Sequence, residues 1–244
     1  MHIFFSTDYE ANRPYLFRNY SRKDLTAERV ERMERLREPI QKERFLLAEY
    51  ITLELLWEEF RETEVRIFGK TGEKPVLCKK DGTPGKMTFS RSYGGNHLAL
   101  AFGNGEKVGI DCEAFLTPDR RVMEYFFTGT ERRFVSESRN PSLLYTLIWT
   151  RKESCMKYTG EGLSFPFQNL ETLEEDFSEK DIRTIPPGFQ GNLTFPAPVR
   201  TRDVCIRSFI IADTVCSVCG SPSAMDVISY QEKRTYEKNH NRLF

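Results

Sequence analysis

The sequence predicts an α+β protein made of two similar α/β subdomains, in which antiparallel strands pack on helices. Each half of the 244-residue chain offers helical patterns together with short alternating segments that are typical of strands. The same order of elements recurs loosely in both halves, with the division near residue 104. The chain is long enough for two small domains. We therefore expect an N-terminal subdomain at 1–104 and a C-terminal subdomain at 105–244.

The first half begins with an apolar segment, residues 3–8, that predicts a strand. Residues 24–38 predict a helix with a partial apolar stripe, which Pro39 interrupts. A second helix, over 41–61, carries so many apolar residues that we expect it to be packed rather than free on the surface. The segment EVRIFGKTGEKPVL then predicts a strand, a glycine turn and a short extended piece.

Glycines mark the end of the first half. The stretch FSRSYGG at 89–95 predicts a glycine-rich turn. Strands are expected at 97–102 and 107–112, with a turn at 103–105 between them. The Asn104–Gly105 pair in that turn is a strong signal for a hairpin.

The second half repeats helices and strands around a long irregular region. Helices are expected at 120–127, 131–138 and 142–158. Residues 161–200 contain five prolines and several Gly and Asn residues, which indicates loops. Closing strands are expected at 205–211, 213–219 and 227–230.

The overall charge excludes some classes of partner. Lys and Arg together number 36, as do Asp and Glu, so no net field attracts nucleic acid or a membrane. No apolar run approaches the length of a membrane span, and the N-terminus lacks the basic start of a signal peptide. Six cysteines in a chain without an export signal indicate reduced thiols and a cytoplasmic protein.

The Cys216–Cys219 pair has the spacing of half a zinc site. The alternation of the surrounding sequence, DTVCSVCG, predicts a strand instead. Side chains three positions apart on a strand face opposite sides. We therefore do not expect these two thiols to share a metal ion or to form a disulfide.

The candidate chemistry lies on one expected strand and one expected helix. Asp111 and Glu113 are two apart, so they share one face of a strand, where two carboxylates repel each other unless a cation lies between them. Trp149, Glu153 and Lys157 are four apart and line one face of a helix. If the strand end faces the helix, three carboxylates surround one divalent ion such as Mg²⁺, and Lys157 neutralises a phosphate oxygen.

The same residues also have a simpler interpretation. Glu153 and Lys157 can form a surface ion pair without function, worth about 0.3–0.5 kcal/mol. Asp111 and Glu113 can stand at a solvated strand end. Spacing alone leaves both interpretations open.

Four segments resemble the signature of 4′-phosphopantetheinyl transferases of the surfactin-synthetase-activating type. VGIDCE at 108–113 resembles the Gly-hydrophobic-Asp-hydrophobic-Glu block of that family, and WTRKESCMK at 149–157 resembles its Trp-(Ser/Thr)-x-Lys-Glu block with a lysine four residues after the glutamate. GEGLSFP resembles the continuation of that block. FFTGTERRFV at 126–135 resembles the segment between the blocks and places Glu131 at its acidic position.

The first half resembles this family more weakly. Lys74 and the following proline look like its Gly-Lys-Pro motif, and Arg44 sits where a coenzyme-contacting arginine occurs. The stretch 89–95 matches Phe-Asn-x-Ser-His-Ser-Gly at Phe89, Ser92 and Gly95, but has Tyr93 in place of a histidine that contacts a coenzyme A phosphate. A tyrosine can donate a hydrogen bond there but carries no positive charge.

The resemblance implies a pseudo-dimer of two α+β subdomains with coenzyme A in the cleft between them. It implies transfer of the phosphopantetheine arm of coenzyme A to a serine of an apo acyl or peptidyl carrier protein, with release of 3′,5′-ADP. The length favours the larger, monomeric kind within the family. Fatty-acid, polyketide and peptide-synthetase carriers all remain open. The segment 120–127 can dock the carrier or form a buried helix face.

The resemblance also implies roles for individual residues. The metal ligands are Asp111, Glu113 and Glu153, which would hold Mg²⁺ or Mn²⁺, and Lys157 stabilises the phosphate charge. Glu153 is the first choice for the base that takes the serine proton, with Glu131 or a water on the metal as rivals. The residues expected to bind coenzyme A are Arg44, Lys74, Ser92, Tyr93, Lys152 and Lys157. Arg29 and Arg32 lie where basic residues for the 3′-phosphate occur, or on a solvated helix face.

Two other functions use the same residues. A Mg²⁺-dependent phosphate or nucleotide hydrolase would employ the three carboxylates with water as the acceptor. A non-catalytic module would bind coenzyme A or a carrier protein without turnover.

Overall fold

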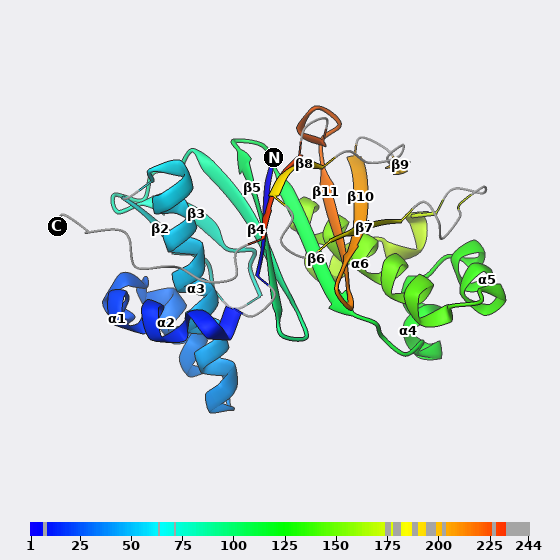
Figure 1. Cartoon of the computed structure of the whole chain (residues 1–244), viewed down its shortest axis with the longest axis horizontal. Coiled ribbons are helices and arrows are strands. Elements are labelled where there is room, and N and C mark those ends of the chain that lie inside the picture. The colour runs from blue at the N-terminus through cyan, green and yellow to red at the C-terminus, as the bar shows by residue number, and fades with distance from the viewer. Residues whose placement is uncertain are drawn as a thin grey trace.

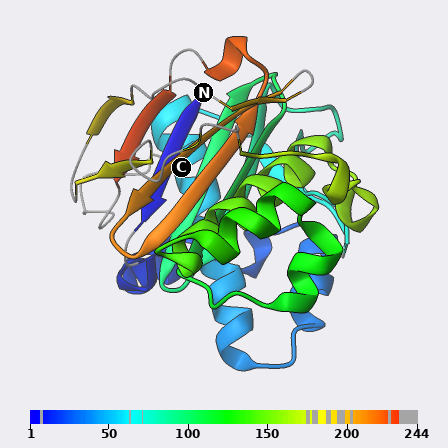
Figure 2. The ribbon, with the colours of Figure 1, turned by 90° about the vertical axis from the view of Figure 1, so that its right-hand side faces the viewer.

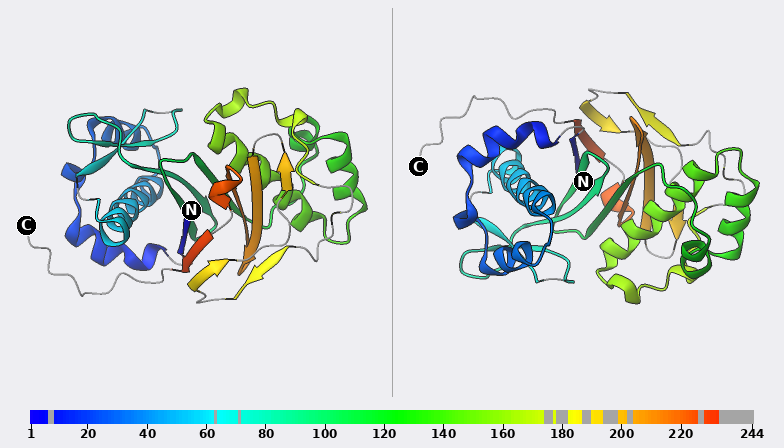
Figure 3. Two further views of the ribbon diagram at one scale, coloured as in Figure 1. Left: turned by 90° about the horizontal axis from the view of Figure 1, so that it is seen from above. Right: turned by 90° about the horizontal axis from the view of Figure 1, so that it is seen from below.

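The computed structural model of the chain describes residues 1–6, 9–62, 64–70, 72–173, 177, 182–186, 190–193, 199–201, 204–225 and 228–232. These residues form a mixed α/β structure with two five-stranded sheets and six α-helices. The sheets lie next to each other in the centre, and a group of helices covers the outer side of each one (Figure 1). The views from above and below show the same order of layers (Figure 3).

The first sheet contains strands from both ends of the chain. Its order is β4 (Met87–Gly94), β5 (His97–Asn104), β1 (His2–Ser6), β12 (Ile228–Glu232) and β8 (Gln190–Leu193). β1 runs antiparallel to β5 and parallel to β12. A separate hairpin joins β2 (Val65–Phe68) to β3 (Val76–Lys79).

The second sheet holds the segment that carries the predicted carboxylates. Its strands are β6 (Val108–Ala114), β11 (Thr214–Gly220), β10 (Val204–Ile211) and β7 (Arg183–Ile185), with β9 (Val199–Thr201) also paired to β10. Among the strands of the described residues, β6 is at the edge of this sheet and pairs only with β11, antiparallel, with Asp111 opposite Ser217.

Two sets of helices flank the sheets. On the first sheet lie α1 (Arg13–Asn19), α2 (Ala27–Glu34) and α3 (Pro39–Phe60). On the second lie α4 (Arg120–Phe126), α5 (Gly129–Glu137) and α6 (Pro141–Thr159), and the side view shows α6 across the strands (Figure 2). Short 3-10 helices are Tyr9–Asn12, Arg22–Asp24, Gly162–Ser164, Phe167–Asn169 and Ser223–Met225.

Alternation along β1 and β5 sorts side chains between two apolar cores. Phe4, Leu100 and Phe102 point toward the α3 side, while Ala99 and Ala101 point into the core between the sheets. Successive strand residues face opposite sides, so one strand serves both cores. The small alanines leave room for the second sheet to approach closely.

Helix α6 begins and ends with local caps that the sequence encodes. Asn140 accepts a hydrogen bond from the Leu143 N–H, and Pro141 occupies the first turn, where its missing N–H costs nothing. Gly160 ends the helix in the left-handed region with φ of 82°. The middle of the helix is buried against β6 and β11, so packing fixes its position on the sheet.

Most expected helices and strands are confirmed, with shifts at their ends. The packed helix at 41–61 is α3, and the helix at 142–158 is α6. The helix expected at 24–38 is shorter, at Ala27–Glu34. Of the first expected strand, residues 7 and 8 lie outside the described residues, as does residue 227 of the last one.

Two expectations are wrong, and a third is incomplete. The stretch 89–95 is mostly strand β4, not a glycine-rich turn. The turn after Asn104 does not close a hairpin, because β5 and β6 belong to different sheets. The segment 161–200, expected to be loops, contributes β7, β8 and β9.

Two features of the second half concern its strands. β8 and β12, which follow residue 105, join the sheet that also contains β1, β4 and β5 of the first half. The strand expected around the two cysteines is confirmed as β11, and they face opposite sides: Cys216 packs in the core between the sheets, whereas Cys219 contacts Cys155 of α6.

Candidate functional site

The site begins where β4 of the first sheet crosses β6 of the second. Three alternate residues of β4 face β6. The Ser90 hydroxyl accepts a hydrogen bond from the Ile110 N–H at 3.1 Å. The Ser92 hydroxyl donates to Asp111 Oδ1 at 2.6 Å. A Cβ placed on Gly94 would lie 2.8 Å from the Cys112 carbonyl oxygen, so only glycine allows this close approach.

Asp111 and Lys157 form the central ion pair of the site. Lys157 Nζ lies 2.7 Å from Asp111 Oδ1 and donates to the Ser92 hydroxyl at 2.9 Å. Burial lowers the pKa of Lys157, but the Asp111 carboxylate outweighs this effect and raises the pKa above its usual value. Lys157 therefore carries a full positive charge at neutral pH.

The two other predicted carboxylates lie close to this pair. Glu113 and Glu153 make no hydrogen bond or ion pair with the described residues. Burial, followed by the negative charge of Asp111, raises the pKa of each to about 7. Part of this repulsion on Glu113 comes from Glu153 itself, which shows that strand β6 and helix α6 bring the carboxylates together.

One oxygen of the site has no partner. Asp111 Oδ2 is buried and accepts no hydrogen bond from the described residues. An unpaired carboxylate oxygen in such a place is costly unless a cation neutralises it. Among the described residues no three acidic, histidine or cysteine side chains are already grouped tightly enough to hold a metal ion. Binding would thus require Glu113 or Glu153 to turn toward Asp111.

The second residue of the VGIDCE segment explains how α6 reaches this strand. A Cβ on Gly109 would lie 2.0 Å from the carbonyl oxygen of Ser154 and 2.6 Å from the backbone nitrogen of Tyr158. The helix backbone rests directly on the glycine. This contact sets the level at which Glu153 and Lys157, which directly precede Ser154 and Tyr158, stand above Asp111.

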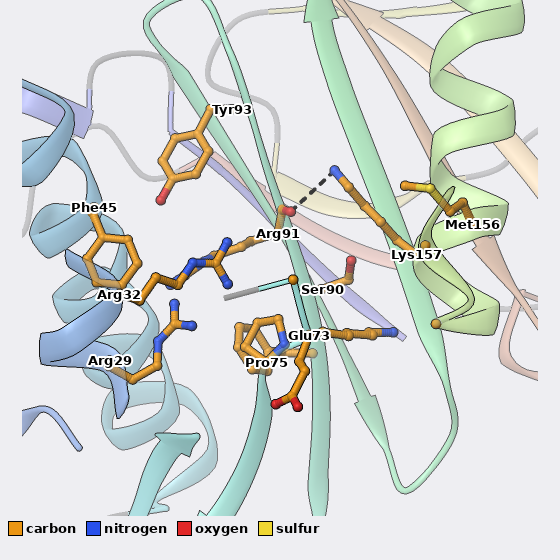
Figure 4. Close-up of a pocket in the computed structure, with 15 residues that line it drawn as sticks. Arg29, Arg32, Phe45, Glu73, Pro75, Ser90, Arg91, Tyr93, Met156 and Lys157 are labelled. Atoms are coloured by element: carbon orange, nitrogen blue, oxygen red, sulfur yellow. Dashed lines mark hydrogen bonds between the residues drawn. The ribbon is translucent and has the colours of Figure 1, made fainter. Parts of the chain in front are cut away.

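A cavity of about 340 Å³ adjoins the carboxylates through Lys157. Its walls come from α2, α3, the loop before β3, strand β4 and the end of α6. The lining residues are Arg29, Arg32, Phe45, Gly72, Glu73, Lys74, Pro75, Phe89, Ser90, Arg91, Tyr93, Met156, Lys157, Gly160 and Gly162. The close-up shows the arginines gathered beside Phe45, with Lys157 reaching in from the other side (Figure 4).

A buried carboxylate holds two of these arginines in place. Glu49, on α3 and fully buried, forms ion pairs with both Arg29 and Arg91. The third, Arg32, makes no hydrogen bond or ion pair with the described residues. Burial, and then the charges of Arg29 and Arg91, lowers the pKa of Arg32. An unpaired guanidinium beside two others is a site for an anion.

Lys74 and Tyr93, two of the residues predicted to bind coenzyme A, line the same cavity. Burial, together with Lys107, lowers the pKa of Lys74 to about 8, and its Nζ donates to the carbonyl oxygen of Val108 at 2.7 Å. Lys74 thereby ties the loop before β3 to the first residue of β6. Tyr93 is partly exposed at the cavity edge.

Four predicted site residues lie elsewhere. Ser92 turns away from the cavity toward Asp111. Arg44 is half exposed and pairs with Glu10 at 3.0 Å, while its neighbour Phe45 lines the cavity. Lys152 and Glu131 are fully buried and do not line the cavity.

The contacts of Lys152 and Glu131 assign them to the folding of a loop. Lys152 Nζ lies 2.9 Å from Glu131 Oε2 and donates to the carbonyl oxygens of Phe167 and Leu170. Glu131 Oε1 accepts two hydrogen bonds from Thr172, and its Oε2 accepts one from the Thr128 N–H. These contacts occupy the whole of both side chains, which corrects the roles expected of Lys152 as a coenzyme ligand and Glu131 as a base.

Three residues that shape the site do not stand out in the sequence. Arg91 was hidden because the stretch around it was interpreted as a turn, whereas alternation along 89–94 places it on the cavity face. Glu49 could have been noticed as an acidic residue within an apolar helix, since a buried carboxylate requires cationic partners. Gly109 stands out in the sequence only as part of the VGIDCE motif.

Comparisons with known proteins find similarity in the part of the chain that carries this site. Residues 107–212 match the 4′-phosphopantetheinyl transferase superfamily. The chain is 31% identical over 109 residues to a human L-aminoadipate-semialdehyde dehydrogenase-phosphopantetheinyl transferase, covering 40% of this chain and 35% of that protein. It is 25% identical over 147 residues to a putative 4′-phosphopantetheinyl transferase of Synechocystis, covering 57% and 58%. The mouse counterpart of the human protein is 30% identical over 118 residues, with coverage of 44% and 38%.

These relatives are transferases, and the chain matches between about one third and three fifths of their length. None of the helices in the described ranges has the length and apolar character to cross a membrane. The matched segment includes Asp111, Glu113, Glu153 and Lys157, the four residues that meet at the junction of β6 and α6. The part of this chain that is similar to the 4′-phosphopantetheinyl transferase superfamily is therefore the part that carries these four side chains.

Proposed function

We propose that the chain transfers the 4′-phosphopantetheine arm of coenzyme A to a serine of an apo acyl or peptidyl carrier protein and releases 3′,5′-ADP. One observation supports this most directly: a cavity lined by cationic side chains opens beside three carboxylates, and Lys157 belongs to both. A donor with several phosphates needs the cations, and transfer of one phosphoryl group needs the carboxylates.

The cavity suits a nucleotide with an extended phosphate chain. Arg32 and Lys74 supply charge that no carboxylate among the described residues neutralises. Phe45 and Tyr93 supply apolar ring surface in the same cavity. We assign coenzyme A to this cavity, with its pyrophosphate toward Lys157.

A divalent ion fits the donor set of the site. Three carboxylates are ligands that Mg²⁺ and Mn²⁺ prefer, and the buried Asp111 Oδ2 lacks a partner. Asp111, Glu113 and Glu153 would hold the ion. When bound, it would neutralise the negative charge that develops on the pyrophosphate.

The residues of the chain itself have separate tasks in the transfer. The serine hydroxyl of the carrier attacks the β-phosphorus, and the bond between this phosphorus and the bridging oxygen breaks as 3′,5′-ADP leaves. Lys157, fixed by Asp111 and Ser92, stabilises the negative charge of the phosphates. Glu153 takes the serine proton, because a carboxylate that holds the ion with one oxygen has a second oxygen free to reach the incoming hydroxyl.

The arrangement of the halves fits the larger, surfactin-synthetase-activating type of this superfamily. Helices flank two adjacent sheets, and the cavity draws its lining from α2, α3 and β4 of the first half and from α6 of the second. We propose that the chain is a pseudo-dimer of this type, active as a monomer.

One assay tests the proposed function. The protein is incubated with an apo carrier protein, coenzyme A and Mg²⁺, and the intact mass of the carrier is followed. We expect a phosphopantetheine adduct that EDTA abolishes and that the Asp111→Asn variant does not form. The exposed Glu137, on α5, offers a matched control as Glu137→Gln, which should retain full activity.

Two other outcomes would contradict the proposal. Breakdown of coenzyme A in the absence of a carrier would indicate a hydrolase. Binding of coenzyme A without any adduct on acyl or peptidyl carriers would indicate a non-catalytic binding module.

A further inference from the structure

We propose that Ser92 is a positioning residue that sets which oxygen of Asp111 is available to the divalent ion. The inference rests on the proposed function, since it concerns the same carboxylates. It assigns Ser92 a task other than contact with the coenzyme. The hydroxyl reaches from the first sheet to two residues of the second half, Asp111 on β6 and Lys157 on α6.

The hydroxyl of Ser92 satisfies two partners at once. A serine hydroxyl has one hydrogen to donate and two lone pairs to accept with. Its hydrogen goes to Asp111 Oδ1 at 2.6 Å, and it accepts from Lys157 Nζ at 2.9 Å. Lys157 closes the triangle with its own contact to Asp111 Oδ1 at 2.7 Å. Ser92 is only 6% exposed, so water competes little for these bonds.

All of these contacts fall on one oxygen of the carboxylate. Asp111 Oδ1 accepts from both Ser92 and Lys157, whereas the buried Oδ2 accepts from none of the described residues. A carboxylate that can turn about its terminal bond offers either oxygen. Two charge-assisted bonds to Oδ1 hold the group in one orientation and leave Oδ2 open. Partners that orient metal ligands in this way tune the affinity for the metal.

Strand β4 makes this arrangement sensitive to the coenzyme cavity. Arg91 and Tyr93, the neighbours of Ser92, line the cavity on the opposite face of the strand. Lys157 Nζ also lies 3.5 Å from the Arg91 carbonyl oxygen, shown as the dashed line in Figure 4. One strand therefore contributes Arg91 and Tyr93 to the cavity from one face and orients the metal-binding carboxylate through Ser92 on the other.

The chain contains a matched control for this role. Ser90 lies two residues before Ser92 on the same face of β4, is also buried, and also bonds to β6. Its hydroxyl contacts the backbone N–H of Ile110 and none of the carboxylates. Ser90 also lines the cavity, so the two variants are compared without coenzyme. Loss of the Ser90 hydroxyl then reports on contacts of β4 other than those with the carboxylates, and loss of the Ser92 hydroxyl reports on the junction together with Asp111.

The test measures binding of Mn²⁺, used as a spectroscopic probe of the divalent site, by electron paramagnetic resonance without substrate. We expect Ser92→Ala to weaken Mn²⁺ binding by about 10–100-fold, as is usual for the loss of a partner that orients a ligand. Ser90→Ala should leave the affinity close to that of the wild-type protein. Equal affinities for Ser92→Ala and Ser90→Ala would overturn the proposal.

A second pair of variants separates orientation from packing. Thr and Val have nearly the same shape, and only Thr keeps the hydroxyl. Ser92→Thr should bind Mn²⁺ more tightly than Ser92→Val, even if Ser92→Ala does not fold, and equal affinities for the two would contradict the proposed role. Absence of Mn²⁺ binding in the wild-type protein would overturn the metal site of the proposed function itself. If instead the wild-type protein binds Mn²⁺ and the Ser92 variants bind it equally tightly, only the role of Ser92 is overturned.

Discussion

The backbone of Ser154 on α6 sits so close to Gly109 on β6 that a Cβ on the glycine would lie 2.0 Å from the serine carbonyl oxygen. Real Cβ atoms essentially never show a contact of this length, and the obstacle is rigid helix backbone. The side chains of Glu153 and Lys157 depend on this contact for their distance to Asp111. The relationship leads directly to the first prediction.

Replacement of Gly109 by alanine should push α6 away from β6. We expect the free energy of unfolding to fall by about 1–3 kcal/mol, as is typical when a packed core receives an extra methyl group. Urea denaturation measures this loss. Gly129→Ala is the control, because the first residue of α5 has only the tip of Arg132 within 4.0 Å of a new Cβ. Similar losses for both variants would contradict the packing argument.

The raised pKa values of Glu113 and Glu153 predict a loss of stability with rising pH. Both carboxyls have a pKa of about 7 in the folded chain, against 4.5 for the ordinary side chain. The folded state then binds protons more tightly than the unfolded state, so this contribution to stability is complete below about pH 4.5 and is lost as the pH rises through about 7. Thermal unfolding without metal should show a falling Tm across this window.

Mg²⁺ should reduce this fall, because an ion bound to the ionised carboxylates stabilises the folded state. Glu153→Gln should flatten the dependence on pH, since it removes one of the two groups. Lys74, with its pKa lowered to about 8, changes stability only above that pH and so does not disturb the test. A Tm that is constant or rises between about pH 5 and 8 would be the contrary result.

Periodicity predicted the elements that carry the site but not their pairing. The helical spacing of Trp149, Glu153 and Lys157 placed them correctly on α6, and the alternation near Asp111 gave strand β6. The partner of β6 is β11, whose residues lie far along the chain, and local patterns hold no information on such a contact. The hairpin signal at Asn104–Gly105 therefore suggested the wrong neighbour.

Strand β4 shows a second limit of local patterns. Its polar residues Ser90 and Ser92 face the other sheet, so the usual alternation of apolar and polar positions is lost. Gly94 resembles a turn signal but is the last residue of β4. It is a glycine because the backbone of β6 occupies the space that a side chain would need. Local sequence patterns do not reveal polar contacts between two sheets, because the partners lie on different strands.

Arg32 gives a prediction for the coenzyme cavity. Its guanidinium has no partner among the described residues, so an anionic ligand should gain a charge-assisted contact. We expect Arg32→Ala to weaken coenzyme A binding by about 10–100-fold, which corresponds to the loss of a hydrogen bond to a charged group. Calorimetric titration measures the affinity. The control is Arg44→Ala, which removes an arginine outside the cavity and should change the affinity little.

Lys152 tests whether a motif residue acts by binding or by folding. The motif suggested a coenzyme contact, but the lysine is fully buried against Glu131 and the carbonyl oxygens of Phe167 and Leu170. Lys152→Met leaves the carboxylate of Glu131 buried without its cation, a change that costs about 3–5 kcal/mol of stability in buried pairs. We expect a large decrease in the urea midpoint.

The double variant Lys152→Met/Glu131→Gln should recover part of this stability, because it removes the uncompensated charge. Coenzyme A affinity, measured under conditions where both variants are folded, should stay near that of the wild-type protein, since neither side chain lines the cavity. The reverse result, a folded variant with normal stability and weakened coenzyme binding, would restore the direct role. Stability and affinity together thus decide between a residue that holds the loop at 167–172 and one that holds the ligand.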